Sequence, residues 1–328
     1  MKFFSSMRIG ILGKGGSGKT TITAALTKYI SNENTVLAID ADQNINLAET
    51  LGIENNTNIS DHNDEIYNYL HKNRNDLEGI PKIGTTPPGI KSKFIRLNKK
   101  DELLNKYAKF QGNIILLQVG SYTENDIGST CFHGKQETIE AIYHHTLDKE
   151  DEYIIADSTA GLDSLGNSLH MVHDVIFYVV EPTLKSTSVY NKFKDVASSR
   201  EIKLFAIANK INDDADISFI EEKIPKSDII AKFSESKNIK ELEKGNLNAL
   251  DKFIEEHKEQ FKLLKDKTQE IKRDWNNYYE KLLKEHKTIS EAWYDSYYGI
   301  KISQKIDPEF SYMKVLDFDE NENNAKDE

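Results

Sequence analysis

Short apolar runs alternate with stretches of helical spacing through the first 245 residues of the chain. The runs predicted to be strands are Ile9–Leu12, Thr35–Ile39, Asn113–Val119, Tyr153–Asp157, Asp174–Val180, Lys203–Asn209 and Asp228–Phe233. Apolar strands separated by helices are typical of a parallel sheet covered on both faces. The pattern therefore predicts an α/β fold in three layers with a mostly parallel, twisted sheet. In such sheets ligands bind beyond the carboxyl ends of the strands.

Residues 55–112 interrupt this alternation with a polar stretch rich in Asn and Lys. Helical patches are expected around Ile66–Leu70 and Leu103–Ala108, and Pro87-Pro88-Gly89 predicts a turn between them. The stretch has too few apolar residues for a core of its own. We interpret it as an elaborated crossover between two strands rather than as a separate domain.

A heptad pattern begins near residue 246 and continues to residue 287 without an intervening Pro or Gly. Its apolar seam is Leu247, Leu250, Ile254, His257, Phe261, Leu264, Thr268, Ile271, Trp275, Tyr278 and Leu282. The spacing predicts one long helix, roughly 60 Å at about 1.5 Å per residue. Two interpretations remain open: the helix folds back on the preceding domain, or it is an arm for a partner or second subunit. Residues 289–315 are expected to cap it through Trp293, Tyr294, Tyr297 and Tyr298.

The charge of the chain is strongly acidic and unevenly distributed. The 328 residues carry a net charge of −11, and residues 288–328 hold 10 Asp and Glu against 4 Lys and Arg. This balance argues against a nucleic-acid binder, which needs cations to neutralise phosphates. We expect three parts: a nucleotide-binding domain over residues 1–245, a helical extension over residues 246–315, and an acidic, disordered tail over residues 316–328.

Cysteine count and apolar run length limit the expected cellular environment. A single cysteine excludes an intramolecular disulfide framework and fits a reducing compartment. Apolar runs such as Val175–Val180 are far too short to span a bilayer, and no signal-peptide core precedes the first strand. We therefore expect a cytoplasmic protein with no membrane span.

A glycine-rich loop follows the first strand and matches the pattern G-x-x-x-x-G-K-T in full. The nucleotide-binding set predicted here is Gly13, Gly15, Gly16, Ser17, Gly18, Lys19, Thr20 and Thr21. Glycines let successive backbone N–H groups turn inward, and the dipole of the following helix favours negative charge. In such a loop Lys19 reaches the β- and γ-phosphates and the Thr20 hydroxyl ligates Mg²⁺. The motif predicts an ATP site.

A second lysine, Lys14, makes this loop similar to one particular version of the motif. The run from Lys14 to Thr20 resembles the deviant phosphate loop of the MinD, ParA and nitrogenase iron protein superfamily. The resemblance implies a P-loop NTPase fold, ATP hydrolysis and a homodimer that sandwiches ATP. It also implies that Lys14 reaches the nucleotide of the partner subunit.

The superfamily resemblance extends to the acidic residues at two strand ends. Asp42 matches the switch carboxylate that activates the attacking water, and Asp40 is expected to support the Mg²⁺ shell or the loop. Gln43 stands where the family usually has proline. Asp157, before Ser158-Thr159-Ala160-Gly161, resembles the second switch: Asp157 would hold Mg²⁺ through water, and Gly161 would turn toward the γ-phosphate.

Asn209 and Lys210 end a later strand and look like the element that lies on the adenine side. The Asn209 amide has the donor and acceptor needed to pair with a base edge. An asparagine in a plain turn at a strand end is nearly as common, so the interpretation depends on where the fold brings this residue.

Cys131 and His133 occupy a segment in which metal-handling members of the superfamily carry cysteine. Here the resemblance is closest to the nickel-insertion accessory ATPases of carbon monoxide dehydrogenase, over about residues 7–245. Those proteins have a C-x-C in this segment, whereas this chain has Cys131-Phe132-His133. Two chains would supply two thiolates and two imidazoles, a set that suits Zn²⁺ or Ni²⁺. The alternative is a buried thiol and a histidine at a helix start. The pairs His144-His145 and His170 with His173 are expected to be structural or to face solvent.

Three functional hypotheses follow. The first is a homodimeric Mg²⁺-ATPase of the nickel-insertion type, coupling nucleotide state to metal or to a protein client at the dimer interface. The second is a non-metal switch of the ParA and MinD kind that recruits a protein partner through residues 246–287. The third is a kinase-like or ligase enzyme acting on a small molecule, which Lys14 disfavours.

Overall fold

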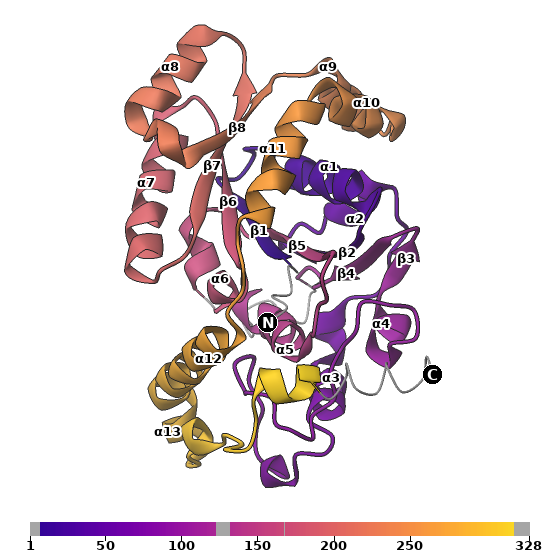
Figure 1. Cartoon of the computed structure of the whole chain (residues 1–328), viewed down its shortest axis with the longest axis vertical. Coiled ribbons are helices and arrows are strands. Elements are labelled where there is room, and N and C mark those ends of the chain that lie inside the picture. Colours follow the sequence, from indigo (N-terminus) through magenta and orange to yellow (C-terminus); the bar gives the residue numbers. More distant parts are fainter. Residues whose placement is uncertain (1–6, 123–131, 167, 318–328) are drawn as a thin grey trace.

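The computed structural model describes residues 7–122, 132–166 and 168–317 of the 328-residue chain. Its strands are β1 (Met7–Gly13), β2 (Thr35–Ala41), β3 (Lys109–Gln111), β4 (Ile114–Gln118), β5 (Glu152–Ser158), β6 (Val175–Val180), β7 (Leu204–Ile211) and β8 (Ile229–Ser234). They form one sheet in the order β3-β4-β2-β5-β1-β6-β7-β8 (Figure 1). Within this sheet β3 pairs antiparallel with β4, and the other neighbouring strands are parallel.

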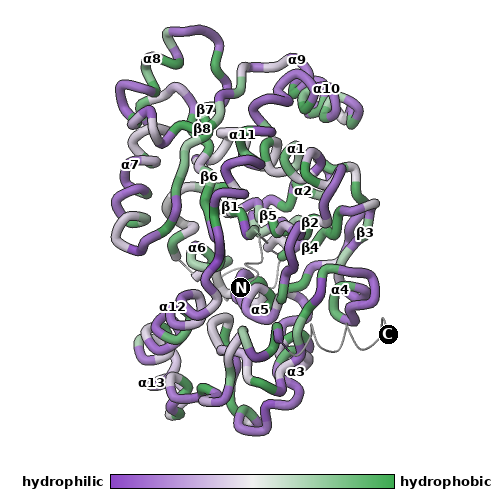
Figure 2. The backbone as a smooth tube through the Cα atoms, viewed as in Figure 1, coloured by the Kyte–Doolittle hydropathy of each residue, from purple (hydrophilic) through white to green (hydrophobic). Residues whose placement is uncertain are grey.

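The helices cover both faces of the sheet, which confirms the three-layer α/β fold. They are α1 (Lys19–Ser31), α2 (Leu47–Leu51), α3 (Asn63–Leu70), α4 (Glu102–Tyr107), α5 (Phe132–His145), α6 (Leu169–Val172), α7 (Leu184–Ser199), α8 (Asp214–Lys223), α9 (Lys237–Leu242), α10 (Asn248–Glu256), α11 (Lys258–Gln269), α12 (Trp275–Ile289) and α13 (Asp295–Tyr298). One face packs against α1, α2, α10 and α11, and the other against α3 to α8. Figure 2 shows hydrophobic residues along the strands and hydrophilic ones over much of the outer helices.

All seven strands expected from the apolar runs are present. The central strands β1 and β5 are buried almost throughout, because helices cover them on both sides and every position meets apolar neighbours. The short edge strand β3 was not expected, since its three residues include Lys109 and Gln111. The crossover over residues 55–112 adds Ile59, Ile66 and Leu104 to the core on the α5 face, so it shares that core.

The single long helix expected over residues 246–287 is wrong, because the chain forms α10, α11 and α12 there. At His257 the backbone leaves the helical region, with φ −117° and ψ 25°. Its imidazole Nε2 instead accepts a hydrogen bond from the backbone N–H of Ser234 on β8, at 3.2 Å. The second break precedes Trp275, where the Asp274 carboxylate accepts from the backbone N–H groups of Asn276 and Asn277 and begins α12. The Asp274 cap thus satisfies N–H groups that have no helical partner at the start of α12, and the His257 contact fixes the first break to β8.

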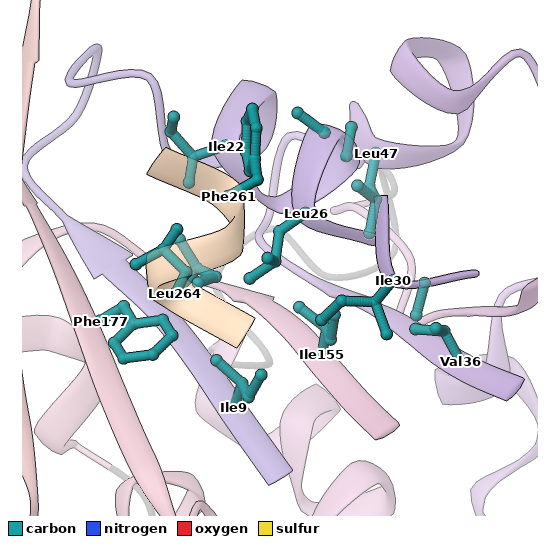
Figure 3. Packing of buried hydrophobic residues seen from close by; sticks show 14 of the residues in the cluster. Ile9, Ile22, Leu26, Ile30, Val36, Leu47, Ile155, Phe177, Phe261 and Leu264 are labelled. Carbon is teal, nitrogen blue, oxygen red and sulfur yellow. The ribbon is translucent and has the colours of Figure 1, made fainter. Parts of the chain in front are cut away.

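The apolar seam of α10 and α11 packs on the α1 face of the sheet, as the fold-back interpretation expected. Leu250, Phe261 and Leu264 are at most 1% exposed and share one cluster with Ile22 and Leu26 of α1. Figure 3 shows Phe261 and Leu264 of α11 beside these α1 residues and above Ile9 of β1. The seam therefore completes the core of its own chain. The division into domains at residue 245 stays a prediction.

The segment just before α12 is joined to the start of β1 by buried ion pairs that share Asp148. Arg8 Nη2 lies 2.7 Å from Asp148 Oδ1, and Arg273 Nη2 lies 2.9 Å from Asp148 Oδ2 and 2.6 Å from Asp174 Oδ2. The Arg8 guanidinium also lies over the ring of Trp275, 5.3 Å from its centroid. These contacts tie the C-terminal part of the chain to its first strand.

The aromatic residues expected to cap the heptad helix behave differently from one another. Tyr294 donates a hydrogen bond to Glu137 of α5, at 2.7 Å. Trp293 and Tyr297, however, are 75% and 80% exposed, so the packing expected of them is wrong. They lie on a π-helical turn (Ser290–Tyr294) and on α13, where only one side of the chain meets the core. Among the described residues no helix has the length and apolar character that a membrane crossing requires.

Candidate nucleotide site

The predicted site residues meet at one edge of the sheet, where the parallel strands end. Asp40 of β2 and Asp157 of β5 are direct register partners, and Asp157 also pairs with Ile11 of β1. The glycine loop follows β1, and Asn209 lies near the end of β7. Their common position is therefore a consequence of strand register and direction.

The glycine loop turns sharply between β1 and α1. Gly18 has φ +95°, and a Cβ placed there would overlap the side-chain nitrogen of Asn209. The backbone N–H of Ser17 donates to the carbonyl of Lys14 at 3.1 Å, which closes the turn. The Ser17 hydroxyl is buried and has no hydrogen-bond partner. A loop of this form at a helix start is suited to bind a phosphate.

Lys19 and Asp42 face each other beside the loop. The Lys19 ammonium lies 3.8 Å from Asp42 Oδ2, and their side chains are only 7% and 10% exposed. Asn44 fixes the carboxylate, since both its backbone N–H and its side-chain amide donate to Asp42 Oδ1, at 3.0 and 2.9 Å. A cation and a carboxylate thus share a largely water-excluded position next to the phosphate loop.

Thr20 and Asp157 form the part of the site with the chemistry for Mg²⁺. Thr20 Oγ1 donates to Asp157 Oδ2 at 2.5 Å. Burial raises the pKa of Asp157 to about 7, although the hydrogen bond from Thr20 and the charge of Lys19 oppose the rise. The Thr20 hydroxyl and the buried Asp157 carboxylate supply oxygen atoms, which are the ligands that Mg²⁺ prefers. The charge of this carboxylate is not fully balanced by its neighbours. The residues therefore fit the expected ion.

Asp40 supports the loop that carries Asp42. Its carboxylate accepts from the backbone N–H of Leu47 at 2.8 Å and from that of Asp42 at 3.3 Å. Burial and the nearby charge of Asp157 raise the pKa of Asp40, and these two N–H groups oppose the rise. The same loop contains Ile45 with φ 45°, a left-handed conformation that costs a β-branched residue about 1–2 kcal/mol. The loop is therefore anchored at its base and strained in its middle.

Asn209 and Lys210 both contact the glycine loop. The Asn209 side-chain amide donates to the Ser17 carbonyl at 2.8 Å, and Lys210 Nζ donates to the Gly16 carbonyl at 2.6 Å. Lys210 also lies 2.8 Å from Glu181 Oε1, and Glu181 Oε2 lies 3.7 Å from Lys14 Nζ. The adenine-side role of Asn209 stays a prediction, and its position against the loop is compatible with it.

Glu181 is the site residue that the motifs did not assign. Its signal in the sequence was its position directly after the apolar run of β6, at the edge where the other site residues end. The segment predicted to be the second switch contains the buried hydroxyls of Ser158 and Thr159, which lack hydrogen-bond partners. Gly161, two residues after Thr159, has φ +69°, and no atom lies within 4 Å of the position that a Cβ would take there. This open space is compatible with the predicted turn of Gly161 toward a phosphate.

The predicted metal pair falls largely outside the description. Cys131 lies outside the described residues, and of His133 only the backbone, in α5, is described. Over the described parts of the chain, no group of three or more His, Cys, Asp and Glu side chains is arranged to hold a metal ion. His144, His145, His170 and His173 are buried, which is compatible with structural roles.

Comparison with known proteins identifies the family. Residues 11–249 match the CobQ/CobB/MinD/ParA nucleotide binding domain, which is more than half of the chain. The chain belongs to this family. The matched range includes the glycine loop, Asp40, Asp42, Asp157, Asn209 and Lys210, whose roles at the site stay predictions.

Two relatives show how far the similarity extends. The chain is 33% identical to an uncharacterised ATP-binding protein of Methanocaldococcus jannaschii over 215 residues, which are 64% of this chain and 78% of that protein. It is 26% identical to the carbon monoxide dehydrogenase accessory protein CooC of Rhodospirillum rubrum over 248 residues, 75% of this chain and 90% of that protein. Family membership and these relatives make the chain an ATPase.

Solved structures agree on the fold. A ParA family ATPase of Chlorobium tepidum matches with a TM-score of 0.54 and 17% identity, over 80% of this chain and 97% of that one. The septum site-determining protein MinD of Pyrococcus horikoshii, complexed with Mg-ADP, matches with a TM-score of 0.51 and 21% identity, over 79% and 94%. At these identities the likeness shows the shared family fold.

Proposed function

We propose that this chain is an ATP-dependent, dimerising Mg²⁺-ATPase switch that serves the maturation of a metal centre. ATP would close two copies face to face, and hydrolysis would release them. The dimer interface would handle either a metal ion or a protein client. The likeness to CooC over 75% of the chain supports the maturation role.

The position of Lys14 is the observation that carries the proposal. Its side chain is 30% exposed, and its ammonium is 3.7 Å from Glu181, whereas Lys19 is buried beside Asp42. Lys19 therefore lies at the proposed phosphate site of its own chain. Lys14 lies at the outer edge of the same loop, where a second nucleotide site facing it would be within reach of a long, flexible side chain.

The remaining residues have roles that follow from phosphoryl-transfer chemistry. Lys19 would neutralise phosphate charge, and Thr20 with Asp157 would hold Mg²⁺, which supplies further charge neutralisation when bound. Asp42 would orient the attacking water, because its carboxylate is fixed by Asn44 next to Lys19. The unpaired Ser17 hydroxyl is available to donate to a phosphate oxygen.

Sedimentation with Mg²⁺ and a non-hydrolysable ATP analogue tests the dimer. We expect a dimer for the natural chain, a monomer for Lys14→Ala, and a dimer for Lys226→Ala, which removes a lysine that is 76% exposed just before β8. A variant that loses the dimer should also lose ATP turnover. A monomer under all conditions, or unchanged turnover in Lys14→Ala, would reject the proposal.

Metal handling has a separate test at Cys131 and His133. A dimer would bring together two thiols and two imidazoles, which suit Zn²⁺ or Ni²⁺. We expect about one metal ion per dimer with ATP present, lost in Cys131→Ser and in His133→Asn. A metal content near zero in the natural chain would remove the metal role and leave the ATPase switch intact.

A second candidate is a switch of the ParA and MinD kind that recruits a protein partner through its C-terminal part. The seam of α10 and α11 is buried in the core, so it is not free for this purpose. The exposed rings of Trp293 and Tyr297 favour a partner surface farther along the chain. Partner capture that disappears in Trp293→Ser with Tyr297→Ser, while Cys131→Ser has no effect, would favour this candidate.

A further inference from the structure

Glu181 lies between two lysines that belong to different parts of the nucleotide site. One carboxylate oxygen is 2.8 Å from Lys210 Nζ, and the other is 3.7 Å from Lys14 Nζ. The Glu181 side chain is 15% exposed, so these cations meet a carboxylate that is mostly removed from water. In this single chain, Lys14 is therefore not free but paired within its own subunit.

The turn between β6 and α7 holds Glu181 in this position. The Thr183 hydroxyl caps α7 by accepting from the backbone N–H of Ser186, at 3.2 Å. The Ser186 hydroxyl in turn accepts from the backbone N–H of Glu181, at 3.0 Å. This reciprocal capping fixes the backbone at the end of β6. The carboxylate is thus presented from a rigid element, whereas its partner Lys14 is on a loop.

Lys210 anchors the other side of the carboxylate. Its backbone has φ +59°, uncommon for a residue other than glycine, and its ammonium also donates to the Gly16 carbonyl at 2.6 Å. With Lys210 bonded to both the carboxylate and the loop, Glu181 is tied to the glycine loop. Of the two cations, Lys14 is the more weakly held, because 3.7 Å is an ion-pair distance and exceeds that of a hydrogen bond.

We propose that Glu181 is a positioning residue that holds Lys14 within its own subunit and releases it when two nucleotide-bound chains associate. The inference rests on the proposed function, because it requires that Lys14 act on the partner's nucleotide. On association, the Lys14 ammonium leaves the Glu181 carboxylate of its own subunit and pairs with the phosphates bound at the facing site. Glu181 opposes association until nucleotide is bound.

The expected effect is modest and has a definite direction. A partly exposed ion pair contributes little free energy, and losing it corresponds to about a two- to fivefold change in an equilibrium constant. Glu181→Gln keeps the size and hydrogen-bonding ability of the side chain but removes its charge. We expect this variant to associate about two- to fivefold more tightly with Mg²⁺ and a non-hydrolysable ATP analogue present.

The control variant is Glu222→Gln on α8. Glu222 pairs with its neighbour Lys223 at 2.7 Å and is 70% exposed, so its removal subtracts the same charge from the chain far from the loop. We expect no change in association for this variant. The gain in Glu181→Gln should also shrink at high salt, where exposed ion pairs are screened. Damage to the fold would weaken association instead of strengthening it.

Combining the variants separates this inference from the proposed function. If Lys14→Ala leaves association unchanged, the proposed function fails. If Lys14→Ala weakens association and Glu181→Gln strengthens it only when Lys14 is present, the inference holds. If Lys14→Ala weakens association but Glu181→Gln does not strengthen it, or strengthens it equally in the Lys14→Ala background, Glu181 does not hold Lys14. A dilution series that extends to the weaker associations gives the dissociation constants of the natural chain, the two single variants and the double variant.

Discussion

Gly18 shows how one atom would change the nucleotide site. Its φ of +95° is a conformation that an L side chain rarely adopts, and an added Cβ would overlap the Asn209 amide. Gly245 has a similar φ of +90° with open space around the Cβ position. The two glycines therefore share the backbone strain and differ in the contact.

This difference yields a matched prediction. We expect Gly18→Ala to weaken ATP binding at least tenfold, because the loop or Asn209 must move. Gly245→Ala should lower the free energy of unfolding by about 1 kcal/mol and leave ATP affinity unchanged. Calorimetric titration with an ATP analogue and urea unfolding measure the two effects. Equal loss of affinity in both variants would contradict the role of the Asn209 contact.

Asp42 carries the second prediction at this scale. Asp42→Asn keeps the hydrogen bonds from Asn44 nearly in place but removes the negative charge beside Lys19. We expect turnover of ATP to fall on the order of 10²-fold or more, as for removal of a group that orients or activates water. Nucleotide binding should persist. Asp64→Asn, on the exposed start of α3, is the control, and a similar turnover in both variants would remove Asp42 from catalysis.

Sequence patterns predicted the site residues that lie close to one another in the sequence. Lys19 and Thr20 follow the glycine loop directly, so a fixed spacing identifies them. The contact of Asn209 with Ser17 joins residues 192 positions apart, and no local pattern encodes it. No motif assigned Glu181, because its place in the site depends on Lys14 and Lys210, which meet it from two other parts of the chain.

At the scale of elements, α11 is the helix whose packing the heptad pattern left open. Phe261 is fully buried against α1, whereas Leu263, two residues later, is 48% exposed. We expect Phe261→Ala to lower the free energy of unfolding by about 3–5 kcal/mol and Leu263→Ala by no more than about 0.5 kcal/mol. Urea unfolding provides both values. Similar small effects would mean that α11 is not part of the core.

The heptad spacing predicted most buried residues of α11 and α12 but not where the helices break, and in α10 Phe253 is buried rather than the predicted Ile254. Burial repeats with a helical period in all three, so the seam remains in register across the gaps. The breaks depend on Ser234, whose backbone N–H donates to the His257 imidazole, and on Asp148 and Asp174, which form ion pairs with Arg273. These partners come from β8 and from the segments before β5 and β6. A pattern within residues 246–287 contains no information about them.

Across the whole molecule, buried histidines make stability depend on pH. Burial lowers the pKa of His145 to about 4 and that of His286 to about 4. In the unfolded chain a histidine has a pKa of about 6.5, so the unfolded state binds protons first as the pH falls. Each of these groups therefore contributes stability above about pH 6.5 that is lost as the pH falls toward 4. The raised pKa of Asp157 acts in the opposite direction, so a single variant is needed to isolate one histidine.

His145→Phe provides that test. Between pH 7.5 and 5.5 we expect this variant to lose about 1 kcal/mol less of its free energy of unfolding than the natural chain. His62→Gln, with a side chain that is 40% exposed, should lose as much as the natural chain. Urea unfolding at the two pH values measures the differences. Parallel losses in all three proteins would show that His145 titrates alike in the folded and unfolded states.

The α/β class and the order of strands along the chain were predictable because buried parallel strands are apolar throughout their length. The spatial order β3-β4-β2-β5-β1-β6-β7-β8 was not, since neighbouring strands are often distant in sequence. The network of Arg8, Asp148, Arg273 and Asp174 illustrates the same limit. Burial alone would raise the pKa of Asp148, but the charges of Arg273 and Arg8 hold it below the ordinary value. Only the folded chain brings these charges together.

Phe253, Phe261 and Leu264 cover the apolar side of α1 in the folded protein. During synthesis this side of α1 therefore stays exposed until the ribosome has added these later residues. More than two hundred residues separate α1 from α11. At about 5–20 residues per second, that interval is on the order of tens of seconds. During this interval the nascent protein exposes a hydrophobic surface that chaperones can bind. The interval ends when α11 emerges from the exit tunnel of the ribosome.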